Sequence, residues 1–177
     1  MLSREAEVKQ IEEAKKDPSK FGPIYEAYFH LIAGYVINRI HDFENAKDLI
    51  QEIFIKAMLH INKYQHRDVP FKFWLLRIAR NELYNHVKKK EWTRVVQYNW
   101  DLLEEEIELE NTLTEKQTNM LIAVLNDLND ADLEIIELRY FEKRSFAEVG
   151  EILQITENNA KVKTYRIIEK IKKELKK

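Results

Sequence analysis

Cysteine is absent from the 177-residue sequence, which excludes disulfide bonds, thiol catalysis and zinc sites with cysteine ligands. Glycine and proline, the residues that most often interrupt helices, occur only three times each. No apolar run approaches the length of a membrane span, and the N-terminal residues MLSREAEVKQ contain no apolar core. We therefore expect no membrane insertion and no secretion signal, and a cytoplasmic location fits these absences.

Patterns typical of catalytic and metal sites are also missing. The five histidines are scattered along the chain, and none of them forms an i, i+4 ligand pair. There is no glycine-rich phosphate loop, and no serine stands in the context of a nucleophile. We therefore expect a protein that is not an enzyme and that uses no metal, no cofactor and no small-molecule substrate.

Charged residues make up 34% of the sequence, but their signs are unevenly distributed. Residues 85–94 are mainly basic, residues 101–115 contain acidic and no basic side chains, and the C-terminal stretch is basic again. Few breakers and many Glu, Lys, Leu and Ile residues favour an all-α fold. We predict two small helical domains, over 1–93 and 118–177, joined by an acidic linker over 94–117 to which we assign no packed role.

Four helices are predicted in the N-terminal domain. Hydrophobic spacing and the few breakers place them over 3–16, 21–40, 46–61 and 71–92. The second should be buried on most sides, and the third should turn one apolar face inward after a cap at Asp42 or Asn45. Phe73 and Trp74 of the fourth are expected in the core. Trp92 can either close the edge of that core or offer a stacking surface to nucleic acid.

The C-terminal stretch 144–177 has the pattern of two helices joined by a tight turn. Ser145 and Thr156 can cap the two helices, and Gly150 indicates that the second helix approaches the first closely. Residues at spacings of three or four form the inward stripe of the second helix: Ala160, Thr164, Ile168, Ile171 and Leu175. With basic residues gathered on the other side, this pattern predicts a DNA-binding helix-turn-helix. The alternative is a solvated amphipathic helix. Helices over 118–128 and 130–141 can complete a small bundle.

Three stretches in this order resemble RNA polymerase sigma factors. Residues 45–65 contain an Asp-Leu-x-Gln-Glu-x-Phe motif at 48–54, which is similar to the polymerase-binding helix of that family. Residues 71–90 are similar to its promoter-melting helix, and residues 128–175 to its C-terminal domain. The likeness is strongest to the extracytoplasmic-function (ECF) group of the sigma-70 family, whose members keep two conserved domains.

The resemblance implies three sets of contact residues. Contacts with the clamp helices of the polymerase's largest subunit fall on Asp48, Gln51, Glu52 and Ile55. Contacts with melting minus-ten DNA fall on Tyr64, Arg80, Asn81, Lys88, Lys89, Lys90 and Trp92. Within that set Asn81 would read an extruded base, and loop 64–69 would wall its pocket. Contacts with the minus-thirty-five element fall on Asn158, Asn159, Lys161, Val162, Lys163 and Arg166.

The sequence departs from the family pattern at three places. Gln154 stands in the turn where glycine is usual, the pair 158–159 replaces a common Gly-Thr, and Asn129 stands where proline often opens a helix. A left-handed conformation costs more free energy for glutamine than for glycine. Gln154 therefore affects the geometry of the turn, and the pair 158–159 affects which DNA sequences the helix would prefer.

The resemblance implies a transcription initiation factor. Its partners would be core RNA polymerase, promoter DNA as duplex and as melted strand, and an anti-sigma factor. Two other functions fit parts of the pattern. The first is a conventional helix-turn-helix regulator whose N-terminal bundle dimerises or senses a ligand, which would require a palindromic site. The second is an adaptor that binds no DNA, which the basic face of the last helix argues against.

Overall fold

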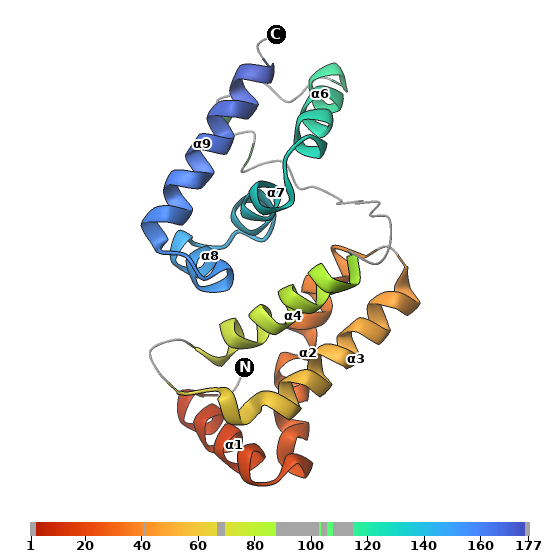
Figure 1. Ribbon diagram of the computed structural model, residues 1–177, viewed down its shortest axis with the longest axis vertical. Helices are drawn as coiled ribbons and strands as arrows, with labels where there is room; N and C mark the ends of the chain where they lie inside the picture. Colours follow the sequence, from red (N-terminus) through yellow and green to blue (C-terminus); the bar gives the residue numbers. More distant parts are fainter. Residues whose placement is uncertain are drawn as a thin grey trace. The chain divides into compact units, whose positions relative to one another are not determined.

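The computed structural model describes residues 3–40, 42–66, 70–87, 103, 106–107 and 115–175. Every regular element in these ranges is helical, which confirms the all-α prediction. The chain divides into two compact units, Met1–Gln97 and Tyr98–Lys177. Each unit is described by itself below, and Figure 1 labels their helices.

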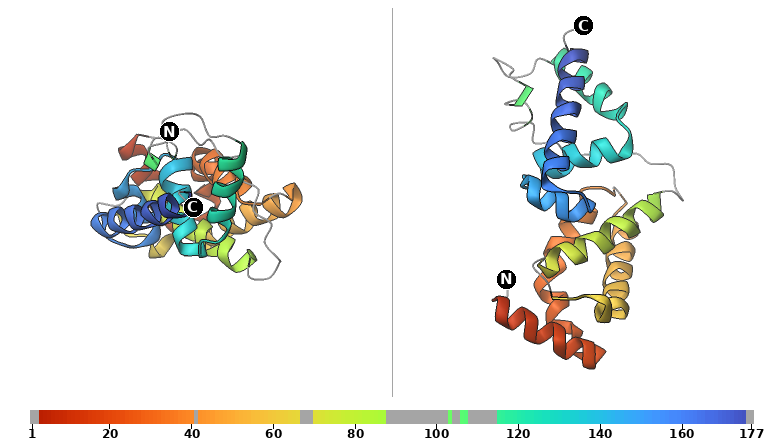
Figure 2. Two further views of the ribbon diagram at one scale, coloured as in Figure 1. Left: turned by 90° about the horizontal axis from the view of Figure 1, so that it is seen from above. Right: turned by 60° about the vertical axis from the view of Figure 1, so that its left-hand side comes forward.

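The N-terminal unit is a bundle built around three packed helices. Its elements are α1 (Arg4–Lys16), η1 (Pro18–Phe21), α2 (Gly22–Ile37), α3 (Phe43–His60), η2 (Ile61–Lys63) and α4 (Phe71–Val87). Helices α2, α3 and α4 pack against one another in pairs, and α1 packs against α2 (Figures 1 and 2). The third helix thus begins three residues before the predicted Ala46, and the fourth begins at the predicted position.

Short-range hydrogen bonds explain where these helices begin. The Ser3 hydroxyl accepts a bond from the backbone N–H of Ala6, with 3.3 Å between the heavy atoms. The Asp42 carboxylate accepts bonds from the backbone N–H groups of Glu44 and Asn45, at 3.0 and 3.2 Å. Of the two predicted caps for α3, Asp42 is therefore the one used, because its side chain precedes the first helical residue.

The predicted inward face of α3 forms the centre of the core of the N-terminal unit. Its buried residues are Leu49, Ile50, Ile53, Phe54 and Ala57, and Met58 is half-buried. Phe73 is buried as predicted, whereas Trp74 is half-buried and packs against the rings of Tyr64 and Phe71. Helix α2 is less enclosed than predicted, because Ile37 near its end is 46% exposed.

The C-terminal unit packs a long final helix against three shorter ones. Its elements are α6 (Glu115–Asn126), α7 (Asp130–Ile136), the π-helical turn η3 (Glu137–Phe141), α8 (Phe146–Leu153) and α9 (Glu157–Leu175). Helix α9 contacts α6, α7 and α8 (Figure 1). The predicted helix 130–141 is therefore an α-helix that widens into a π turn. Asn129, which replaces the family's proline, caps it through the backbone N–H of Asp132 at 2.9 Å.

One expectation about the acidic stretch 94–117 is wrong. Leu103 is fully buried and Ile107 is 6% exposed, and both belong to the hydrophobic core of the C-terminal unit. They lie in that cluster with Leu121, Leu125, Tyr140 and other residues of the unit. The irregular apolar spacing of the stretch gave no sign of this role, because two buried apolar residues form no repeating pattern in the sequence. The predicted limits of the linker remain a prediction.

Candidate nucleic-acid and protein interfaces

The turn between α8 and α9 has the tight geometry of a helix-turn-helix. A Cβ atom placed on Gly150 would lie 2.8 Å from the carbonyl oxygen of Ile155 and 3.3 Å from the backbone nitrogen of Glu157. Only glycine fits at that distance, so the predicted close approach is confirmed, and it is made by the turn and the first residue of α9. The Ile155 N–H also donates to the Gly150 carbonyl at 3.0 Å, which ties the turn to α8.

Gln154 adopts the left-handed conformation that the family's glycine would take. Its backbone angles are φ 58° and ψ 40°, a region that costs a residue with a Cβ about 1–2 kcal/mol. Glutamine therefore adopts the conformation that glycine would adopt at lower cost, and the turn is less stable than it would be with glycine.

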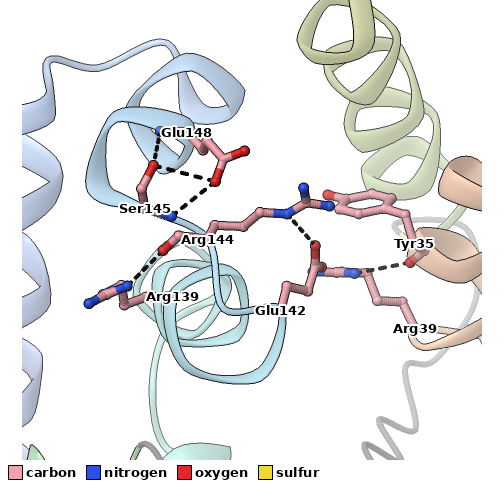
Figure 3. A network of polar contacts seen from close by, with 7 residues as sticks. All are labelled: Tyr35, Arg39, Arg139, Glu142, Arg144, Ser145 and Glu148. Atoms are coloured by element: carbon pink, nitrogen blue, oxygen red, sulfur yellow. Dashed lines mark hydrogen bonds and ion pairs between the residues drawn. The ribbon is translucent and has the colours of Figure 1, made fainter. Parts of the chain in front are cut away.

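Polar contacts hold the start of α8 (Figure 3). Ser145 and Glu148 form a capping box, in which the Glu148 N–H donates to the Ser145 hydroxyl at 3.2 Å and the Ser145 N–H donates to the Glu148 carboxylate at 3.1 Å. The Arg139 guanidinium donates to the Arg144 carbonyl at 2.9 Å, and Arg144 pairs with Glu142 at 3.3 Å. These bonds fix the first helix on which α9 rests.

Helix α9 separates an apolar face from a basic polar face. Of the predicted inward stripe, Ala160, Thr164, Ile168 and Ile171 are buried and Leu175 is half-buried. Of the predicted minus-thirty-five contacts, five are exposed, namely Asn158, Asn159, Lys161, Val162 and Arg166, and Lys163 is half-buried. The Thr156 hydroxyl accepts from the Asn159 N–H at 3.2 Å, as predicted for the cap. The first turn of α9 thus leaves two amide side chains in solvent.

Two further residues belong to the faces of α9: Ile167, which the predicted stripe omits, and Tyr165, which the helical spacing already places on the outer face. Ile167 is 4% exposed and belongs to the core, which makes the apolar face wider than the predicted stripe. Tyr165 is 42% exposed, and its ring centroid lies 6.1 Å from that of Phe146 on α8. Tyr165 shares the outer face with Val162 and Arg166, so its spacing in the sequence already indicated an exposed aromatic group.

The four predicted polymerase contacts lie together on the outer face of α3. Asp48, Gln51 and Glu52 are exposed, and Ile55 is 52% exposed. Leu59, one turn beyond Ile55, is 66% exposed and continues the same stripe. The sequence pattern places Leu59 outside the inward face of this helix, and its spacing of four from Ile55 adds it to the predicted contact surface, which did not include it. An apolar stripe flanked by acidic groups suits a protein partner with a basic rim.

Glu52 on this face also takes part in a cluster of ion pairs. The Lys56 ammonium lies 2.9 Å from the Glu52 carboxylate, one turn away on α3. The same ammonium pairs with Glu82 on α4. The hydrogen bond to Glu82, followed by the bond to Glu52, raises the pKa of Lys56 above its ordinary value. Lys56 therefore stays charged and joins the two helices.

The predicted minus-ten contacts differ in how exposed their side chains are. Asn81 on α4 is exposed and Arg80 is half-buried. Tyr64 is only 3% exposed, with its ring centroid 5.0 Å from that of Phe71 and 5.6 Å from that of Trp74. Burial raises the pKa of its phenol. Its ring is therefore a core group here and offers no surface for a base to stack on. Lys88, Lys89, Lys90 and Trp92 lie outside the described residues.

Metal sites and membrane-spanning helices are absent from the described part of the chain. Among the described residues no group of histidine, aspartate and glutamate side chains could hold a metal ion. Within that part of the chain, each helix is too short or too polar to cross a membrane. The three surfaces on α3, α4 and α9 are thus the candidates that remain.

Comparison with known proteins identifies the family. Residues 24–93 match Sigma-70 region 2, and residues 124–173 match Sigma-70, region 4. The chain belongs to the sigma-70 family of transcription initiation factors. Within that family it falls in the extracytoplasmic-function (ECF) group. Similar members are SigM and SigW of Bacillus subtilis, both named ECF RNA polymerase sigma factors and both 28% identical to this chain.

These relatives match the chain over most of its length. The match to SigM covers 84% of this chain and 91% of SigM, and the match to SigW covers 94% and 95%. Among solved structures, the sigma factor RpoE in complex with the anti-sigma factor NepR from Bartonella quintana is similar, with a TM-score of 0.54 and 18% identity. That match covers 88% of this chain and 96% of the RpoE chain. It supports the fold of two helical domains.

Proposed function

We propose that this sigma factor binds core RNA polymerase through the α3 surface, that is, through Asp48, Gln51, Glu52 and Ile55, with Leu59 extending it. The observation that supports the proposal is that these residues share one exposed face of α3, with polar side chains in its first part and exposed apolar ones in its last. Exposed Ile55 and Leu59 have no role in the core, and a partner that covers them would gain the free energy of burying apolar surface.

We propose that α4 supplies the contacts to melted minus-ten DNA. Asn81 is exposed and carries an amide that can pair with an unstacked base. Arg80 and the basic residues Lys88, Lys89 and Lys90 would hold phosphates, and Trp92 would stack. Because Tyr64 is buried, its role would be to support Phe71 and Trp74 at the start of α4 rather than to touch DNA.

We propose that the outer face of α9 enters the major groove of the minus-thirty-five element. Asn158 and Asn159 can pair with base edges, and the exposed side chain of Val162 can pack on a thymine methyl group. Lys161, Lys163 and Arg166 would mainly hold phosphates, although Arg166 can also pair with guanine. The supporting observation is that five of these six side chains are exposed on one helix of a helix-turn-helix.

The remaining parts of the proposal concern the chain as a whole. The functional domains would span 1–93 and 118–177, with the linker over 94–117. The protein would act in the cytoplasm without catalytic activity of its own, because its part is to direct polymerase to promoters and to open them. By analogy with the RpoE–NepR complex, an anti-sigma factor would control it.

Transcription in a reconstituted system tests this function directly. Core polymerase with the protein should start transcription from a subset of a genomic fragment library, and permanganate should detect unpaired thymines near each start. Asn81→Ala should leave core binding unchanged but lower opening by about tenfold, since losing a base contact costs about 1–3 kcal/mol. A mismatched bubble at the minus-ten position should restore transcription by this variant.

The matched control for Asn81→Ala is Asn38→Ala, an exposed asparagine at the end of α2. It should open promoters like the wild type. Equal opening by Asn81→Ala and wild type would contradict the role of Asn81. A protein that binds no core polymerase and selects no fragment would contradict the function itself.

Selection from a randomised duplex pool separates the two kinds of contact on α9. Asn158→Ala should change the preferred sequence, at about 1–3 kcal/mol per lost base contact. Lys161→Ala should instead weaken all sequences alike and reduce the magnitude of the negative slope of log affinity against log salt by about 0.9. If both variants shift the sequence preference in the same way, or if the wild type enriches no sequence from the pool, the outer face of α9 does not recognise DNA as proposed.

A further inference from the structure

The ion-pair cluster on α3 and α4 joins two groups of very different exposure. The Glu82 side chain is 13% exposed, whereas that of Glu52 is 54% exposed, and Lys56 between them is 36% exposed. A carboxylate that is largely removed from water needs a close positive partner. The ion pair between Glu82 and Lys56 is therefore the stronger of the two that Lys56 forms. The pair between Glu52 and Lys56, four residues apart on one helix surface, is a weak one.

We propose that Glu82 is a positioning residue for polymerase binding, because it retains Lys56 and so leaves the Glu52 carboxylate available to a basic group of the partner. The inference rests on the proposed polymerase-binding role of Glu52. An ammonium group has three donor hydrogens and can serve both carboxylates at once. When a basic partner group reaches Glu52, Lys56 can release Glu52 and still keep its bond to Glu82.

The arrangement would work differently without the charge of Glu82. Lys56 would then have only Glu52 as an ionised partner within the described cluster, and its bond to Glu52 would strengthen. A basic group of the polymerase would then have to displace Lys56 from Glu52, and Lys56 would have no second carboxylate in this cluster to pair with. The same residues would be exposed on α3, but the charge of Glu52 would be neutralised by Lys56.

A double-mutant cycle on the full chain tests the inference. Glu82→Gln keeps the size of the side chain and one acceptor oxygen but removes the charge. It should weaken binding to core polymerase by about twofold in the wild-type background, since an exposed pair four residues apart is worth about 0.2–0.5 kcal/mol. It should have no further effect in a Glu52→Gln background, because the effects of substitutions in one ion-pair network are not additive. Glu26→Gln, an exposed glutamate on α2, is the charge-matched control and should bind core polymerase normally.

The outcomes separate the inference from the function on which it rests. If Glu52→Gln weakens core binding but Glu82→Gln has the same effect in both backgrounds, or no effect, the positioning role is wrong and the polymerase surface stands. If Glu52→Gln leaves core binding unchanged, Glu52 is not a contact and the positioning role of Glu82 is wrong, whereas the substitutions at Asp48 and Ile55 test the rest of the surface separately. Thermal unfolding of each variant is measured alongside, because a purely structural loss would lower core binding equally in both backgrounds. If Glu82→Gln does not fold, Glu82→Asp replaces it, with a smaller loss expected only where Glu52 is intact.

Discussion

Replacing Asp48 and Ile55 together by lysine should lower the affinity of the protein for core RNA polymerase by about 100-fold. A 100-fold loss corresponds to about 2.8 kcal/mol, which one hot-spot contact of about 2 kcal/mol and the repulsion of a reversed charge by a basic partner would together supply. Both side chains are exposed in the N-terminal unit. The free energy of unfolding should therefore change by only about 0.5 kcal/mol. Fluorescence anisotropy with labelled protein and core enzyme measures the affinity.

The matched control is the double change Glu26→Lys and Ile37→Lys on α2. Glu26 is exposed and Ile37 is 46% exposed, so the chemistry of the substitutions is the same at a different place. This variant should bind core polymerase like the wild type. Core binding that survives the change at Asp48 and Ile55, or that fails equally in the control, would show that the outer face of α3 is not the contact surface.

Gly150→Ala should disrupt the helix-turn-helix and reduce binding to promoter duplex by tenfold or more. The new Cβ would lie 2.8 Å from a backbone carbonyl oxygen, which cannot move without shifting the start of α9. Overpacking of this kind costs about 1–3 kcal/mol. Hydrogen exchange of peptides from α8 and α9 should show faster exchange than in the wild type, while peptides from α2 and α3 keep their protection.

Gly34→Ala is the control, because it makes the same substitution at a glycine that has room for a Cβ atom. A Cβ at Gly34 would have no other heavy atom within 4 Å, and the residue lies inside α2. Alanine should therefore stabilise α2 by roughly 0.5–1 kcal/mol, because it loses less backbone entropy on folding than glycine does. DNA binding should remain unchanged. A Gly150→Ala protein that binds duplex and exchanges like the wild type would contradict the close approach at the turn.

The candidate sites were only partly predictable from local pattern. On α9 the exposed positions followed from the helical period, since the inward and outward residues alternate regularly there. Just after η2, the resemblance to sigma factors named Tyr64 as a DNA contact, but its ring packs against Phe71 and Trp74. A tyrosine has both an apolar ring and a polar hydroxyl, so sequence alone does not decide whether it is buried.

The sequence by itself determined the all-α class, the caps at Ser145 and Thr156 and the inward stripe of α9. These features depend on hydrogen bonds and spacings within a few residues, so a short window contains their causes. The tertiary structure alone decided that Leu103 and Ile107 join the C-terminal core and that Lys56 bonds to Glu82, 26 residues away. Such contacts depend on which faces meet when the helices pack, and a local period carries no information about the partner on the other side.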